Sequence, residues 1–560
     1  MDLYGIWDRY DKSKVYMDKE GILTQTEKNW EMYIGNQWSA LEDSQGMENL
    51  PMLNIIKPTV KYKVSSIAQH AVTAVFSSMN EADEGILDSL NKLFDISWEK
   101  SKMNKIAWQT LKESAIQGDS YVYFGQGGDT RLSPQILKNV QVRLGDENIT
   151  DIQKQPWIIV EERLPVAVIK ERARLQGLDN SEIELIMSDA ERVNVLYNHQ
   201  EVSDKCTSLL YMEKDIKTGI VYVARATRDV VYEPYRPIQQ RLKGEYNGVG
   251  LTVYPIVSMI WDEMPNCARG MSEVEELIPN QIEINKTLAR RSMSIKMTAY
   301  PRVAYDSASI ENPEDLDKVG AAIKLNGGNA MAINNMISYL SPQAMSQDAK
   351  LYSDELLEMT RNLAGASDAQ LGNIDLSRVS GTAAQTIRDQ QQVPLNEQVA
   401  MYQNFVENTA LLWFELWKTY YPNGLSWDGI EVSAEDISLV QPNVRVDIAE
   451  DTTISRMATQ QELTNLFNAG KISFAEYAEA YPEHAAIPKE TLESIVNKRL
   501  QDMQMTGMPP MDEMGNPMDV PIDLQGNLDD VQTKNLGGAN AVSFQSMQQQ
   551  LAPNAPLVQG

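Results

Sequence analysis

The chain has 560 residues, a length that allows two to four separately folded domains. Its 50 basic and 78 acidic residues give a formal net charge of −28, and such a field repels nucleic acid. This argues against a repressor, a polymerase clamp or a packaging nucleoprotein. No run of residues approaches the roughly 18 unbroken apolar residues of a membrane span. The first ten residues carry acidic side chains where a signal peptide is basic and then apolar, so we expect no export by that route.

Cysteine and histidine are scarce. Cys206 and Cys267 lie far apart in sequence, and the histidines are His70, His199 and His484. Two cysteines exclude a disulfide framework, and this set lacks the ligand spacing of a zinc site. We therefore expect two ordinary thiols, no metal ion and no cofactor.

The first 120 residues favour helices. Residues 18–40 favour an aromatic-rich helix with a turn at Gly35, and residues 58–79 favour an amphipathic helix. A third helix is expected from residue 84 to residue 117, and it stops at Gly118.

Short β-prone runs follow this third helix. They occupy residues 121–124, 157–160, 193–197, 209–213, 220–224 and 229–232. A helical stretch at about residues 165–190 interrupts them, and Lys217-Thr218-Gly219 predicts a turn between two strands. We therefore predict an α+β region that ends in a meander.

From residue 270 the chain becomes largely helical. Ser272 followed by Glu275 is typical of a capping box, and an apolar stripe continues to about residue 300. Pro279 is expected to kink this helix or to begin it anew. A second helix is predicted at 341–365, so the two helices carry a small lobe of about 40 residues, an uncommon arrangement in a compact enzyme.

The last third mixes helices with one β-prone patch. We expect a loop at 366–378, a helical segment at 381–421 broken at Pro394, β-prone residues at 430–448 and two or three short helices in 453–502. The aromatic stripe of the 381–421 segment is typical of an ordinary core face. Residues 503–560 are rich in Met, Gln, Pro and Gly without apolar periodicity, which predicts a disordered tail.

Carboxylate doublets leave open a metal-dependent nucleic-acid enzyme, because two-metal nucleases need clustered acids. The doublets are Glu161–Glu162, Glu275–Glu276, Glu450–Asp451 and Asp529–Asp530. Adjacent side chains point to opposite faces of a strand and about 100° apart on a helix, so the two carboxylates of a doublet do not meet. The sequence has no Walker-A loop, nucleophile elbow, dinucleotide fingerprint or His-Glu-x-x-His. We therefore expect no catalytic residue and no enzyme activity.

Three passages carry a family likeness through their order and spacing. The first is LNIIKPTV at 53–60, and the second is DIQKQPWIIVEERLPV at 151–166. The third is the pair of long helices with its lobe, followed by GASDAQLG at 365–372 and SGTA at 380–383. Together these passages resemble the portal proteins, or head-to-tail connectors, of tailed bacteriophages, over about residues 50–500.

The resemblance implies an α+β, mainly helical fold that assembles as a ring of twelve subunits. The implied parts are a wing at 1–240, a wing exit and first stem helix at 241–300, a clip at 301–341, a second stem helix at 342–365, a tunnel loop and long kinked helix at 366–421, a wing return and helical crown at 422–502, and the tail at 503–560.

The implied function is a structural ring at a unique capsid vertex of the virion. Its channel would serve double-stranded DNA packaging and ejection, and an acidic conduit suits DNA that must slide without sticking. The implied partners are further copies of the chain, the DNA, the terminase large subunit, the major capsid and scaffolding proteins, and the head-completion or tail adaptor that replaces the terminase. No membrane is implied, and synthesis would take place in the bacterial host cytoplasm.

The resemblance also implies channel residues. The tunnel loop would contain Ser377, Arg378, Val379, Ser380, Gly381 and Thr382. Arg290, Arg291 and Lys296 are the basic residues expected near the channel, with a solvated position or an ion pair between subunits as the alternative for each. For the whole chain the alternative is another phage structural protein of the neck, baseplate or scaffold. Scaffolds are mostly helical, whereas residues 121–232 favour strands.

Overall fold

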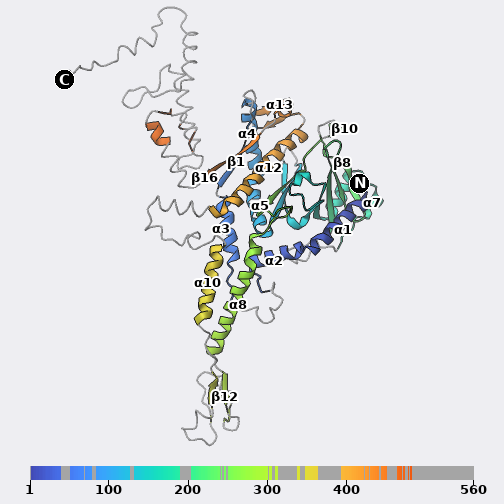
Figure 1. The fold of residues 1–560 in the computed structure, drawn as a ribbon. Helices are drawn as coiled ribbons and strands as arrows, with labels where there is room; N and C mark the ends of the chain where they lie inside the picture. Colours follow the sequence, from blue (N-terminus) through green and yellow to red (C-terminus); the bar gives the residue numbers. More distant parts are fainter. Residues whose placement is uncertain are drawn as a thin grey trace, which may run out of the picture. The chain divides into compact units, whose positions relative to one another are not determined.

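The structure is a computed structural model of the full chain, which divides into two compact units, residues 1–449 and 450–560. It describes residues 2–38, 51–68, 70–77, 84–126, 132–189, 204–239, 250–299, 302–305, 337–340, 347–363, 393–421, 423–427, 429–440, 443–450 and 463–468, with a few shorter pieces. The described part combines helices and sheets, as expected for the α+β class (Figure 1). Among the described helices, none has both the length and the apolar character that crossing a membrane requires.

Two helices open the chain, α1 (Leu3–Lys19) and α2 (Ile22–Ile34). The Asp2 side chain caps α1 by accepting a hydrogen bond from Gly5 N at 3.2 Å. The prediction of one helix over 18–40 is wrong at its beginning, because Gly21 has a φ of 70° and separates the two helices. The predicted turn at Gly35 is confirmed, with a φ of 103° at the end of α2.

The predicted helix at 58–79 is half wrong. Helix α3 (Ile56–Ala68) is followed by strand β1 (His70–Ser77), which pairs with β16 (Asn443–Glu450). Asn91 lies along the other side of β1: its Oδ1 accepts from Phe76 N at 2.8 Å and its Nδ2 donates to Phe76 O at 3.2 Å. The strand that pairs with β1 lies more than 350 residues away in the sequence, so the local apolar pattern does not reveal β1.

The predicted helix at 84–117 is two helices, α4 (Glu84–Lys100) and α5 (Met103–Gln117). Lys102 adopts a positive φ of 54° between them. The predicted end at Gly118 is confirmed, and its φ is 96°. A Cβ at Gly118 would lie 2.1 Å from the carbonyl oxygen of Gly270, so only glycine fits this close contact of two loops.

A five-stranded antiparallel sheet forms from strands in the order β4-β5-β6-β7-β8. The strands are β4 (Val142–Leu144), β5 (Trp157–Pro165), β6 (Lys205–Lys214), β7 (Val221–Ala226) and β8 (Val231–Pro237). The predicted turn between β6 and β7 is confirmed, with Gly219 at a φ of 71°. Helix α1 packs on this sheet through Ile6, Trp7 and Tyr10. Helices α6 (Val166–Leu175) and α7 (Asn180–Glu184) form the predicted helical interruption.

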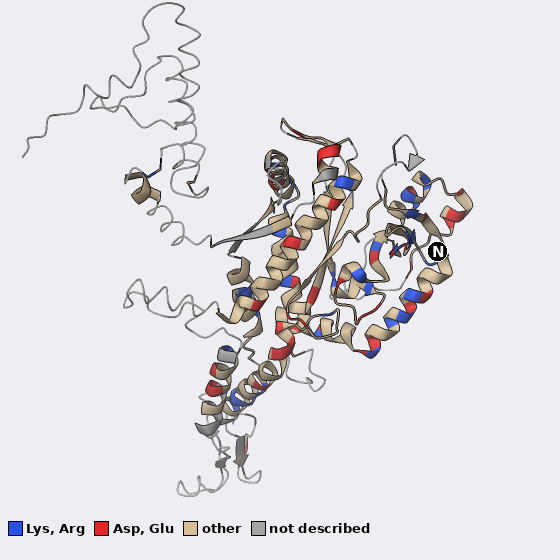
Figure 2. Cartoon of the chain, turned by 45° about the horizontal axis from the view of Figure 1, so that its top comes forward, with Lys and Arg blue, Asp and Glu red and all other residues tan. Residues whose placement is uncertain are grey.

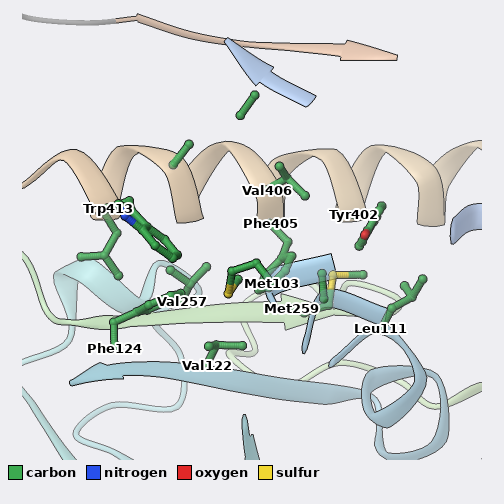
Figure 3. Close-up of a cluster of buried hydrophobic side chains, with 14 of the residues drawn as sticks. Met103, Leu111, Val122, Phe124, Val257, Met259, Tyr402, Phe405, Val406 and Trp413 are labelled. Atoms are coloured by element: carbon green, nitrogen blue, oxygen red, sulfur yellow. The ribbon is translucent and has the colours of Figure 1, made fainter. Parts of the chain in front are cut away.

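A second sheet has three antiparallel strands in the order β11-β2-β3. They are β11 (Ile256–Ile260), β2 (Asp119–Gln126) and β3 (Leu132–Lys138). Helix α12 (Asn396–Tyr420) lies across this sheet, with Trp413 and Phe405 directed at β11 and β2 (Figure 3). A short 3-10 turn (Val393–Leu395) precedes α12 at the predicted break, and residues 381–392 of the predicted helical segment lie outside the described residues.

Small elements complete the described chain. Strands β9 (Arg241–Leu242) and β10 (Glu245–Tyr246) pair with each other, as do β14 (Leu425–Trp427) and β15 (Ile430–Val432), and α13 (Ala434–Leu439) follows. Residues 463–468 are helical. The predicted strand at 193–197, the loop at 366–378 and the tail at 503–560 lie outside the described residues.

Candidate functional site

Two long helices, α8 (Glu273–Ala299) and α10 (Gln347–Leu363), lie side by side (Figure 1). The 27 residues of α8 span about 40 Å at 1.5 Å per residue. Between α8 and α10 in the sequence lie strands β12 (Arg302–Tyr305) and β13 (Ile337–Leu340), which pair with each other in antiparallel orientation. The described parts thus contain the two predicted helices and a β pair in the predicted lobe.

The beginning of α8 is anchored in the protein core. Ser272 caps the helix, because its Oγ accepts from Val274 N at 3.0 Å, and the same hydroxyl donates to Ile116 O of α5 at 2.7 Å. Glu273 forms an ion pair with Lys63 of α3 at 2.7 Å. Pro279 lies inside α8, which continues through it without a second beginning.

The first half of α8 also holds the passage at residues 53–55. Gln281 Nε2 donates to Leu53 O at 2.7 Å, and Gln281 Oε1 accepts from Ile55 N at 2.9 Å. Asn285 Oδ1 accepts from Leu53 N at 3.2 Å. Gln281 and Asn285 are buried. Their two amide side chains therefore satisfy the backbone N–H groups of Leu53 and Ile55 and the C=O group of Leu53. Residues 53–55, which open the first passage of the family likeness, are therefore hydrogen-bonded to α8, the helix with which the third passage begins.

The outer half of α8 is basic. No acidic residue follows Glu283 on this helix, whereas Lys286, Arg290, Arg291 and Lys296 do. Arg290 is exposed and lies 3.8 Å from Glu283 Oε1, and within the described chain neither Arg291 nor Lys296 forms an ion pair. The structure thus places the three predicted basic residues on the outer half of one helix.

Helix α10 carries the opposite charge. Its acidic residues are Asp348, Asp354, Glu355 and Glu358, against Lys350 and Arg361 (Figure 2). Large apolar side chains are also exposed on the pair, namely Met293 and Ile295 on α8 and Leu351, Tyr352 and Met359 on α10. Leu351 is 60% exposed and Met359 61%. Exposed apolar groups of this size beside charged ones are typical of surfaces that bind another protein.

The six predicted tunnel-loop residues, 377–382, lie outside the described residues. Sequence reasoning found the basic residues of α8 but missed the exposed apolar side chains on α8 and α10. Their signal was present in the sequence as apolar residues, but the sequence does not say which of them the subunit leaves uncovered.

The doublet at Glu161–Glu162 is divided between two arginines. Glu161 pairs with Arg143 at 2.8 Å, and Glu162 pairs with Arg225 at 2.6 Å. Both carboxylates are buried on β5, where adjacent side chains point to opposite faces. Each carboxylate therefore has its own counter-charge, and the doublet is not a shared metal-binding pair. Within the described ranges, no group of three or more His, Cys, Asp or Glu side chains is placed to hold a metal ion.

The two cysteines are free thiols. Burial, together with the neighbouring Asp189 carboxylate, raises the pKa of Cys206 to about 12. The thiol is therefore protonated at neutral pH and is a poor nucleophile.

No curated protein matches the chain. A sequence profile of the phage P22-like portal protein family matches residues 9–427, which is well over half of the chain. The matched range runs from α1 to β14 and includes both sheets and both long helices. Because the match covers well over half of its residues, the chain belongs to the phage P22-like portal protein family.

Proposed function

We propose that the chain forms a closed ring of twelve subunits at a unique capsid vertex. The channel of this ring carries double-stranded DNA during packaging and ejection. Membership of the portal family supports this function, and it supports a structural rather than a catalytic role.

The observation that carries the proposal is the set of exposed apolar and charged side chains on the paired helices α8 and α10. The basic outer half of α8 and the acidic helix α10 each expose large apolar side chains within a single subunit. In a ring, α8 of one subunit meets α10 of the next, so that both the apolar area and the charges find partners. Burial of apolar surface contributes about 25 cal/mol per Å², which favours association over exposure.

The remaining parts are proposed from the family likeness. Residues 241–300 form the wing exit and the first stem helix, residues 301–341 the clip, and residues 342–365 the second stem helix. Residues 1–240 form the wing, and residues 422–502 the wing return and crown. The clip binds the terminase large subunit and later the head-completion or tail adaptor, while the wing contacts the major capsid and scaffolding proteins.

Two sets of residues are proposed to lie near the DNA. Ser377, Arg378, Val379, Ser380, Gly381 and Thr382 form the tunnel loop. Arg290, Arg291 and Lys296 face the channel or pair with acidic residues of the neighbouring α10. A few basic rings in an otherwise acidic channel would steady the duplex without holding it.

Native mass and negative-stain images of the purified protein test the ring. We expect closed rings with a mass near twelve times 63.0 kDa and a central hole wide enough for a duplex. A compact dimer or tetramer without a hole would contradict the proposal.

Crosslinking to DNA stalled during packaging tests the tunnel loop. A photoreactive thiol label on Thr382→Cys should crosslink to DNA, and the same label on Lys217→Cys, in an exposed turn of the wing, should not. The unaltered chain gives the background of its two native thiols. Crosslinks from position 217 alone would exclude residues 377–382 from the channel wall.

A further inference from the structure

The two outer edges of the sheet β11-β2-β3 differ in what they offer to another strand. In an antiparallel sheet, successive residues turn their backbone groups alternately to one side and to the other. Phe124 N donates to Pro255 O at 2.8 Å. The backbone groups of residues 120, 122 and 124 of β2 therefore bond to β11, and those of residues 121 and 123 bond to β3. The register then turns Pro134 and Ile136 of β3 outward. Because proline has no backbone N–H, Pro134 blocks this edge against strand addition.

The edge of β11 has no such protection. Trp261 N donates to Gly118 O at 2.8 Å, which confirms the alternation and turns Ile256, Ser258 and Ile260 outward. The side chain of Gln153 covers the first part of this edge by donating to Ile256 O at 3.2 Å. Beyond it, the N–H and C=O groups of Ser258 and Ile260 have no hydrogen-bond partner within the described residues.

A groove of about 480 Å³ runs along this unprotected edge. Its floor is β11, and its walls are the segment Thr150–Gln153 and helix α12. The α12 wall presents Met401 and Leu411 together with the exposed amides of Asn404 and Asn408. Apolar side chains on a wall beside free backbone groups are what an added strand requires, because its side chains alternate and its main chain continues the sheet.

The groove is negatively charged. Asp151, Glu263 and Glu415 line it, and no Lys, Arg or His is among its described lining residues. Asp151 already pairs with Lys154 at 3.1 Å. Neither Glu263 nor Glu415 forms an ion pair with any described residue, so both carboxylates are available to a cationic ligand.

We infer that the groove between β11 and α12 binds an extended segment of a partner protein. The segment adds a fourth strand to the sheet at Ser258 and Ile260, places apolar side chains against Met401 and Leu411, and offers Lys or Arg to Glu263 and Glu415. The charge of the groove favours a basic partner over a second copy of this chain, whose net charge is −28. The inference does not depend on ring assembly.

Peptide binding to the full chain, followed by fluorescence anisotropy, tests this site. The probes are a labelled pool of ten-residue peptides in which Lys alternates with Val, Ile, Leu or Phe, and a matched pool with Glu in place of Lys. We expect the Lys pool to bind and the Glu pool to bind at least tenfold more weakly. No binding of the Lys pool, or equal binding of both pools, would overturn the inference.

Variants on the two edges of the sheet test the mode of binding. Ser258→Pro removes a free N–H from the β11 edge and should reduce binding at least tenfold. Ile136→Pro makes the same change on the β3 edge and should leave binding unchanged. Asn408→Trp, at an exposed position of α12, fills the groove without changing the strand and should also abolish binding. An equal loss in Ile136→Pro, or no loss in Asn408→Trp, contradicts strand addition at this site.

The carboxylates and the source of the segment need separate controls. Glu263→Gln with Glu415→Gln should weaken binding of the Lys pool roughly tenfold, as two exposed ion pairs allow, and Glu20→Gln should not.

A benzophenone amino acid at position 408 reports the natural occupant. If it crosslinks to another copy of the chain in purified protein without peptide, the occupant is a second copy and the partner proposed here is wrong. The native mass distinguishes these results from a failure of the ring.

Discussion

Arg269 is buried where the segment before α8 meets both sheets. Its guanidinium donates to the carboxylates of Asp119 at 3.2 Å and Glu147 at 2.9 Å. It also donates to the carbonyl oxygens of Asn139 and Val142, each at 2.9 Å. One side chain therefore joins β2, the beginning of β4 and the entry to α8, and it pairs with one buried carboxylate, Asp119, and one partly buried carboxylate, Glu147.

Replacing Arg269 with Met should destabilise the chain strongly. Asp119 and Glu147 would be left without their counter-charge, and breaking a buried ion pair in this way costs about 3–5 kcal/mol. Urea unfolding at pH 7 measures the loss. Arg174→Met is the matched control, since Arg174 pairs with Glu171 on an exposed face of α6 and should change stability by less than about 1 kcal/mol. Equal stability of the two variants would show that Arg269 does not hold these elements together.

Glu113 predicts a pH dependence of stability. Burial raises the pKa of this carboxyl, although Lys138 and Lys112 act in the opposite direction. The folded chain then holds the proton more tightly than the unfolded chain, so this group's contribution to stability is present at low pH and is lost as the pH rises through the raised pKa.

Glu113→Gln should therefore raise the unfolding temperature at pH 7 relative to the unaltered chain. The gain should shrink as the pH falls towards 4.5, the ordinary value for glutamate. The hydrogen bond from Gln117 Nε2, 2.7 Å long, can be kept by the amide oxygen. Thermal scans at several pH values measure the difference, with exposed Glu99→Gln as the control. A gain that is largest at low pH would contradict the direction of the shift.

At the scale of elements, α8 and α10 divide their charges. The division is visible in the sequence, because four basic residues and no acidic one follow Glu283 on α8, while α10 carries four acidic residues. Within one subunit the described ion pairs use few of these charges. The two helices therefore offer a direct test of which surfaces meet in the ring.

Charge reversal should weaken the ring and double reversal should restore it. Arg291→Glu with Lys296→Glu places acid against acid, and Glu355→Lys with Glu358→Lys places base against base. Each exposed pair contributes about 0.2–1 kcal/mol, and the effect is repeated at every interface of the ring and falls with salt. Native mass at low and high salt measures the assembled fraction.

The fourfold variant, which exchanges the charges of both helices, should assemble like the unaltered chain. Lys14→Glu with Lys217→Glu makes the same change in net charge as the reversal on α8, but on exposed residues elsewhere, and should not affect assembly. Assembly of both reversed pairs without loss would mean that α8 and α10 of neighbouring subunits do not meet through these residues, even if the ring itself forms.

At the scale of the whole molecule, the portal profile covers most of the first compact unit. The match ends at residue 427, and the first compact unit ends at residue 449. The remaining residues carry little apolar periodicity after residue 503. We therefore expect the core and the ring contacts to be complete without the last 58 residues.

A chain ending at residue 502 tests this expectation. Its unfolding temperature and its native mass per subunit should equal those of the full chain, because segments without a periodic apolar face bury too little surface to stabilise a fold. A fall in unfolding temperature, or loss of the ring, would show that residues 503–560 take part in folding or assembly.

Local chemistry determined the features that the sequence predicted correctly. Helix ends at Gly35 and Gly118, the turn at Gly219 and the cap at Ser272 depend on residues close in sequence, so their patterns could be recognised. The adjacent acids Glu161 and Glu162 were correctly expected not to meet, because alternation along a strand is also a local property.

Long-range partners decided the rest. Strand β1 is a strand because it pairs with β16 and Asn91, and its sequence alone favoured a helix. The basic residues of α8 were found from the sequence, but their grouping with exposed apolar side chains depends on which faces the core covers. The same holds for the open edge of β11, since the alternation of its backbone groups is fixed only by pairing with β2. The sequence by itself determined the family, the order of the elements and their local ends. Burial and strand register arise from contacts between distant residues, so only the tertiary structure decided them.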